Sequence, residues 1–99
     1  AGVDKDARML AEQKVDAQAL VDAIEAALSS DSDLLDAQEI EQLELAITVL
    51  KRDIAADDLQ TLRRSTDQLG KLSEPFAERR MNRSIQQALQ GKSLEEFGG

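Results

Sequence analysis

Carboxylates are the most numerous groups in this 99-residue chain that could do chemistry. They are dense at Asp31, Asp33, Asp36, Glu39, Glu41 and Glu44. A calcium-binding loop needs alternating acids, a central glycine and a distal bidentate glutamate. Asp31 and Asp33 have the first spacing, but the sixth position of such a loop is Asp36 instead of glycine. We therefore expect helix capping and a solvated acidic face here, and no metal site.

General acid–base work by these carboxylates would need a pocket that raises a pKa. The chain contains two phenylalanines and no Trp or Tyr to line one. It also contains no Cys and no His, which excludes a disulfide framework, a zinc finger, a thiol nucleophile and the usual proton shuttle near neutral pH. We expect these residues to form no enzyme active site and to bind no cofactor.

Basic side chains cluster at Arg79, Arg80 and Arg83, with Met81 and Asn82 between them. The net charge is −8, of which residues 1–58 carry −10 and residues 59–99 carry +2. A nucleic-acid site would need aromatic partners and a basic surface, and the chain offers neither. Pairing of the arginines with the acidic first half is the favoured interpretation, and a docking patch for an acidic partner is the alternative. Met81 is expected in the core.

The elements that position these groups are predicted to be helices, because one proline and few internal glycines interrupt the chain. We predict a single all-α domain over residues 1–99, with a long N-terminal helix leading into a small antiparallel bundle of three to four helices. The expected helices span residues 4–30, 36–55, 57–70 and 74–90, followed by a loosely ordered tail over 91–99. Gly70 and Pro75 predict a kink or a break, and Gly91 is placed to end the last helix.

Apolar residues recur every three or four positions, which is the spacing of one helix face. The expected stripes are Ala17, Leu20, Val21, Ile24, Ala27 and Leu28; Ile40, Leu43, Ile47, Leu50 and Ile54; Leu59, Leu62, Thr66, Leu69, Leu72 and Phe76; and Ala77, Met81, Ile85, Ala88 and Leu89. Asp36 and Glu39 have the spacing of a capping box at the start of the second helix. Asp57, with Gln60 three positions later, is expected to open the third.

The first half of the long helix, from Asp4 to Asp16, has no such stripe and no helix breaker. At about 1.5 Å per residue the whole helix is about 40 Å long, which is more than a 99-residue domain can cover. We expect nothing within this chain to bury the first half. Met9, Leu10, Val15 and Asp16 are the candidates for contact with another domain.

Two stretches resemble the lid region of HscA-type members of the DnaK-type heat-shock chaperone family. They are Ala7-Arg8-Met9-Leu10-Ala11-Glu12-Gln13-Lys14-Val15 and Ala77-Glu78-Arg79-Arg80-Met81-Asn82-Arg83-Ser84-Ile85, the second followed by Ala88-Leu89-Gln90-Gly91. The resemblance implies a C-terminal helical lid over a β-sandwich that grips a peptide, with the ATP-binding domain outside these residues. It also implies a parent protein that assists iron–sulfur cluster assembly with the J-domain cochaperone HscB and the scaffold IscU. The resemblance places Gln18 where DnaK has an acidic latch residue, with Asp16 nearby, so no latch residue carries over cleanly.

A second hypothesis is a free-standing helical adaptor, or a module that forms homodimers. No apolar run approaches the roughly 20 residues that span a bilayer, and no signal-like segment opens the chain, so a cytoplasmic location is expected.

Overall fold

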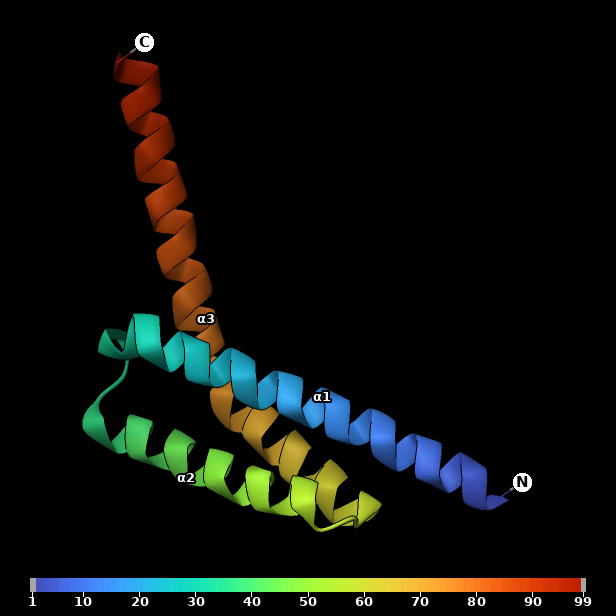
Figure 1. The fold of residues 1–99 in the computed structure, drawn as a ribbon. Helices are drawn as coiled ribbons and strands as arrows, with labels where there is room; N and C mark the ends of the chain where they lie inside the picture. Colours follow the sequence, from blue (N-terminus) through green and yellow to red (C-terminus); the bar gives the residue numbers. More distant parts are fainter. Residues whose placement is uncertain (1, 99) are drawn as a thin grey trace.

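The computed structural model describes the backbone of residues 2–98 and the side chains of residues 7–90. Helix α1 (Gly2–Asp31) is followed by one turn of 3-10 helix, η1 (Ser32–Leu34), and then by α2 (Ala37–Ala55) and α3 (Leu59–Gly98) (Figure 1). No strand occurs within residues 2–98. The all-α class is therefore confirmed, but the bundle holds three α-helices because the two last expected helices are one.

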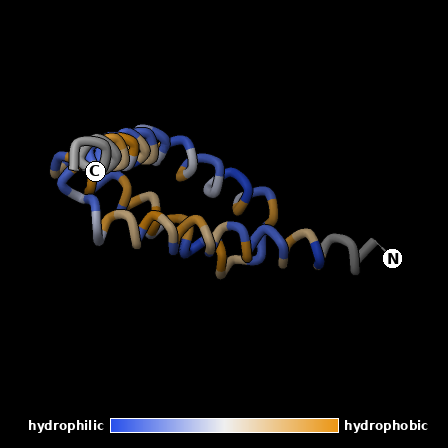
Figure 2. Tube along the Cα trace, turned by 90° about the horizontal axis from the view of Figure 1, so that it is seen from above, coloured by the Kyte–Doolittle hydropathy of each residue, from blue (hydrophilic) through white to orange (hydrophobic). Residues whose placement is uncertain are grey.

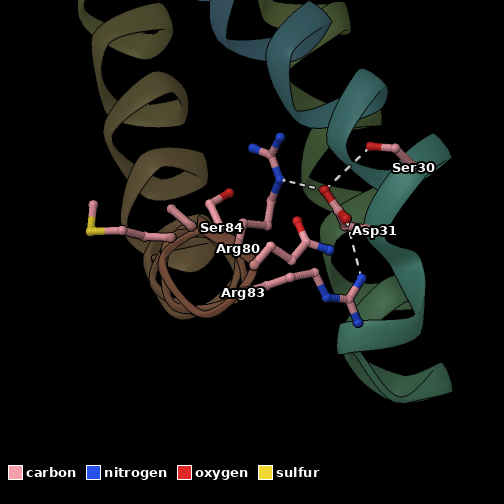
Figure 3. A pocket seen from close by; sticks show the side chains of 8 residues that line it. Ser30, Asp31, Arg80, Arg83 and Ser84 are labelled. Carbon is pink, nitrogen blue, oxygen red and sulfur yellow. Dashed lines mark hydrogen bonds and ion pairs between the residues drawn. The ribbon is translucent and has the colours of Figure 1, made fainter. Parts of the chain in front are cut away.

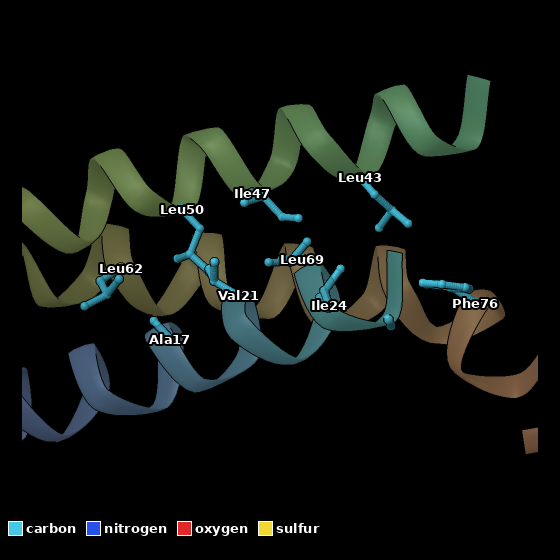
Figure 4. Packing of buried hydrophobic residues seen from close by; sticks show 10 residues of the cluster. Ala17, Val21, Ile24, Leu43, Ile47, Leu50, Leu62, Leu69 and Phe76 are labelled. Atoms are coloured by element: carbon cyan, nitrogen blue, oxygen red, sulfur yellow. The ribbon is translucent and has the colours of Figure 1, made fainter. Parts of the chain in front are cut away.

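The three helices pack around a single hydrophobic core (Figure 4). The buried apolar residues are Ala17, Val21, Ile24 and Ala27 of α1, Leu43, Ile47 and Leu50 of α2, and Leu62, Leu69 and Phe76 of α3. All ten belong to the predicted stripes. Side chains three or four positions apart share a helix face, so each helix turns one continuous apolar face inward.

The start of α2 forms as its sequence predicts. The Asp36 side chain accepts a hydrogen bond from the Glu39 backbone N–H at 2.8 Å, and the Glu39 carboxylate accepts one from the Asp36 N–H at 3.1 Å. This capping box satisfies two donors that the first turn of a helix cannot bond internally. It fixes the point at which the chain turns back along α1.

The turn between α2 and α3 differs from the prediction, because Asp58 and not Asp57 caps α3. The Asp58 carboxylate accepts a hydrogen bond from the Thr61 N–H at 3.2 Å. Asp57 has a left-handed φ of 58° and directly follows Ala56, the C-cap residue of α2. Aspartate tolerates this conformation better than most residues, so Asp57 ends one helix and Asp58 starts the next.

Helix α3 bends at Pro75 without breaking (Figure 1). Proline cannot donate to the carbonyl of Lys71 and its ring crowds that carbonyl, which is the usual cause of a sharp kink. Ser73 donates from its hydroxyl to the carbonyl of Gly70 at 2.9 Å, just before the bend. Phe76 is only 2% exposed, and this burial anchors the chain directly after the kink.

The part of α3 beyond the bend, residues 77–98, is here called distal α3. In Figure 2 it is seen nearly end-on while the bundle helices run across the view, so it leaves the bundle steeply. The expected stop at Gly91 is wrong, since the helix continues to Gly98; one glycine inside a helix costs only about 1 kcal/mol. The expected tail is thus helical to Gly98, although its side chains and residue 99 lie outside the described part.

The molecule is elongated, at 63 × 33 × 17 Å with a radius of gyration of 17.9 Å. A compact domain of this length would have a radius of about 13 Å. The excess comes from the two helix ends that leave the bundle in different directions (Figure 1). Within the described residues, no helix is both long enough and apolar enough to cross a membrane.

Candidate protein-interaction surfaces

The four candidate contact residues on α1 do not lie on one surface. Val15 is 68% exposed and Asp16 is also exposed, whereas Met9 and Leu10 are half-buried. Leu10 packs against the hydrophobic core, and Val15, five positions on, lies about 140° around the helix from it. The side of α1 that is open for another domain is therefore the side of Val15 and Asp16.

The expectation that nothing in this chain covers the first half of α1 is wrong for its last turns. Helix α2 has 19 residues and runs back along α1, so the turn that follows it reaches the level of Lys14. Lys14 forms an ion pair with Asp57 in that turn. The part of α1 without bundle contacts is thus shorter than residues 4–16. The amide of Gln18 donates a hydrogen bond to Asp22 of the same helix at 2.9 Å.

The three arginines of distal α3 all bind the corner between α1 and α2. Arg80 Nε donates to Asp31 at 2.9 Å, and Arg83 donates to Asp31 at 3.3 Å (Figure 3). Arg83 also donates to Asp33 at 3.0 and 2.5 Å. Arg79 donates to the Glu39 carboxylate at 2.9 Å and to the Leu34 carbonyl at 3.1 Å. The three arginines and the three carboxylates that they bind are here called the arginine cluster.

The arginine cluster joins the acidic and basic halves of the chain, as the charge distribution predicts. Hydrogen bonds from Arg80, Arg83 and Arg79 lower the pKa values of Asp31, Asp33 and Glu39, respectively. The guanidinium of Arg80 also lies 5.9 Å from the centroid of the Phe76 ring, within cation–π range. The arginines thus stabilise the corner internally, and a docking role for Arg79, Arg80 and Arg83 stays a prediction.

An open cavity of about 640 Å³ lies beside the arginine cluster, between Ser30 and Asp31 of α1 and distal α3 (Figure 3). Its ionisable side chains are Asp31 and the two arginines bonded to it, Arg80 and Arg83. Among the described residues, no group of three or more His, Cys, Asp or Glu side chains could hold a metal ion. The cavity holds ion pairs, and the Ser30 hydroxyl donates a further hydrogen bond to Asp31 at 3.3 Å.

Distal α3 carries an apolar stripe that the bundle does not cover. Met81, Ile85 and Leu89 are 63%, 49% and 58% exposed. The prediction that Met81 lies in the core is wrong, because the bend at Pro75 directs the following turns away from the bundle. A repeat of apolar residues shows which side of a helix is apolar, but not whether another element covers that side.

A second uncovered apolar surface is a groove of about 390 Å³ between α2 and α3. It is lined by Gln42, Leu45, Ala46, Val49, Gln68 and Leu72, together with Ser65. Leu45 is 65% exposed and Leu72 is 39% exposed. Sequence periodicity does not indicate this α2–α3 groove, because its residues lie outside the predicted stripes except for Leu72.

One buried polar pair was also not predicted. Asp53 of α2 is 5% exposed and Ser65 of α3 is 8% exposed, and the Ser65 hydroxyl donates a hydrogen bond to the Asp53 carboxylate. A buried carboxylate is costly unless it is bonded, so this pair constrains how α2 and α3 align. Asp53 lies three positions after Leu50, on the apolar face of α2. A polar residue on that face is the sequence feature that could have predicted the buried pair.

Comparison with known proteins gives consistent results. The sequence model of the Hsp70 protein family matches residues 1–82. The chain is similar to proteins named "Chaperone protein HscA homolog" from Methylococcus capsulatus (44% identical over 95 residues), Burkholderia thailandensis (45% over 97) and Neisseria meningitidis serogroup B (42% over 97). These alignments cover 96–98% of this chain and 15–16% of the relatives, so the chain spans about one sixth of their length.

Proposed function

Because the chain belongs to the Hsp70 family, we propose that it forms the helical lid of the substrate-binding part of an HscA-like chaperone. The observation that carries the proposal is the outer side of α1. This helix extends to Gly2, and Val15 is 68% exposed on it. A second domain that packed there would cover an apolar side chain that the bundle leaves in water.

In this proposal the lid acts by stabilising the closed, peptide-bound state of its parent. A lid changes peptide release only if it makes more contact in the closed state than in the open state. The outer side of α1 would supply that difference, and the bundle would keep the helix straight and rigid behind it. ATP binding and peptide binding would belong to other parts of the parent protein.

The experiment uses the full-length protein that contains this chain. Deletion of residues 1–99 should speed the dissociation of a fluorescent peptide, measured by anisotropy. Val15→Asp should also speed it, because a charge would have to be buried in the closed state. Gln38→Asp is the matched control, since Gln38 is exposed on the first turn of α2, where an acid is well tolerated. Equal release rates for the intact and deleted proteins would contradict the lid proposal.

The similarity to HscA homologues extends the proposal to iron–sulfur cluster assembly, with HscB and IscU as partners of the parent. The test is binding of IscU by the full-length protein in the presence of HscB, compared with the protein that lacks residues 1–99. Weaker retention of IscU by the deleted protein supports the proposal. A native product near 10.8 kDa would instead favour a free-standing helical adaptor.

A further inference from the structure

Two apolar surfaces of this chain remain uncovered, and they lie on different parts of the fold. One is the stripe of Met81, Ile85 and Leu89 on distal α3, which is about half or more exposed along its length. The other is the α2–α3 groove, whose apolar lining comes from Leu45, Ala46, Val49 and Leu72. The first surface is convex and the second is concave.

The two surfaces match in length. The groove extends from Gln42 to Val49 along α2, which is about 10.5 Å, and the stripe extends from Met81 to Leu89, which is about 12 Å. An amphipathic helix that binds in a groove does so through side chains that recur every three or four positions on one face. The stripe has this spacing, so it would fill the groove along most of its length.

The two surfaces also match in charge, because few charged side chains lie on them. Between Met81 and Leu89 the one charged residue is Arg83, whose guanidinium is bonded to Asp31 and Asp33, and no charged side chain lines the groove. In a chain with 32% charged residues and a net charge of −8, this is uncommon. Two copies of such a chain repel over most of their surfaces, and contact between these two regions avoids placing like charges together.

The stripe does not reach the groove of its own chain. The bend at Pro75 directs distal α3 away from the bundle (Figure 1). The arginine cluster holds it there through Asp31, Asp33 and Glu39. A second copy can provide the missing surface without any change in this arrangement. Reciprocal exchange buries both surfaces twice and closes with two-fold symmetry, as in most homodimers.

We propose that two copies of this chain pair reciprocally, with the distal α3 stripe of each seated in the α2–α3 groove of the other. The groove of each copy is thus occupied by distal α3 of the other copy. This inference does not depend on the lid proposal, because neither surface includes the outer side of α1.

The test is a charge exchange in the full-length protein, with mass measured by sedimentation over a series of micromolar concentrations. Leu45→Glu places an acid in the groove, and Ile85→Lys places a base on the stripe. Each variant alone should raise the dimer dissociation constant by about tenfold or more, since an unpaired charge would be buried. Gln38→Glu adds the same charge outside the groove and should leave the dissociation constant unchanged.

The mixture of the two variants decides between reciprocal and other pairing. In one contact of the mixed dimer, the stripe of the Ile85→Lys copy meets the groove of the Leu45→Glu copy, so the two introduced charges are opposite and attract. The other contact is the unmodified stripe in the unmodified groove. Mixing should therefore restore dimers that neither variant forms alone. Disruption by Ile85→Lys but not by Leu45→Glu would indicate stripe-to-stripe pairing and overturn the proposal. A protein that stays monomeric throughout, or a dimer insensitive to both changes, would also overturn it.

Discussion

The buried pair of Asp53 and Ser65 is expected to contribute measurably to the stability of the bundle. The carboxylate is 5% exposed, and besides Ser65 it has only Arg52 within reach among the described side chains, with Nε at 3.5 Å. The Arg52 side chain is 74% exposed and therefore screened by water. The hydroxyl of Ser65 is thus the main partner of a carboxylate that has lost most of its hydration.

The size of the effect follows from this burial. Ser65→Ala removes a hydrogen bond to a charged group, which costs about 1.5–3 kcal/mol. Asp53→Ala leaves a buried hydroxyl without a partner, which costs about 1–3 kcal/mol. The double variant leaves neither group unpaired, so its loss should be smaller than the sum, with a coupling energy of about 1–2 kcal/mol. For a domain whose total stability is about 5–15 kcal/mol, this is a large share.

The assay is urea denaturation followed by circular dichroism at about 222 nm, a wavelength that reports α-helix, for the four proteins of the cycle. The pair of Lys71 and Asp67 on α3 is the matched control, because its 3.1 Å ion pair joins side chains that are 72% and 65% exposed. Its coupling energy should be below about 0.5 kcal/mol. Equal coupling energies for the two pairs would refute the argument that burial gives the first pair its strength.

Three further predictions follow from the core, the arginine cluster and the bend. Leu50→Ala should lower the free energy of unfolding by about 2–5 kcal/mol in the same assay, because Leu50 is fully buried in the core that the three helices share. The lowered carboxyl pKa values of the arginine cluster mean that its pairs stabilise the fold above the unfolded carboxyl pKa of about 4 and are lost as the pH falls through the folded values. Spin labels on distal α3 and on α2 should therefore show a broader distance distribution at about pH 2.5 than at about pH 7, and an unchanged distribution would contradict this. Pro75→Ala should straighten α3, so that labels at Gln68 and Gln87 approach the separation of about 28 Å expected for a straight helix of about 19 steps.

The sequence predicts the core of this fold well because the core depends on helix periodicity. Val21, Leu50 and Leu62 are fully buried, and each lies on a predicted stripe. The capping box of Asp36 and Glu39 was predictable for a similar reason, since it depends on residues three positions apart. Such local rules hold wherever the element forms, whatever packs against it.

The burial of the other residues depends on which side chains of another helix lie opposite them, and a single sequence does not contain that information. Met81 has the spacing of a core residue but is 63% exposed, because the bend before it turns its face from the bundle. Leu10 has no stripe around it, yet it packs on the core, and Lys14 one turn later pairs with Asp57 in the turn after α2. Asp53 is polar but buried, because Ser65 faces it and donates a hydrogen bond.

We expect the bend at Pro75 to divide α3 into two units of cooperativity. The part before it cannot open without exposing Leu62 and Leu69, so its amides should exchange with solvent hydrogen only when the whole bundle unfolds. Residues 77–90 of distal α3 bury little and are held mainly by half-exposed ion pairs, so their amides should exchange through local opening. A single continuous helix would then show two levels of amide protection against hydrogen exchange, with the change at Pro75. A partner that binds distal α3 would raise the protection only of the amides after Pro75.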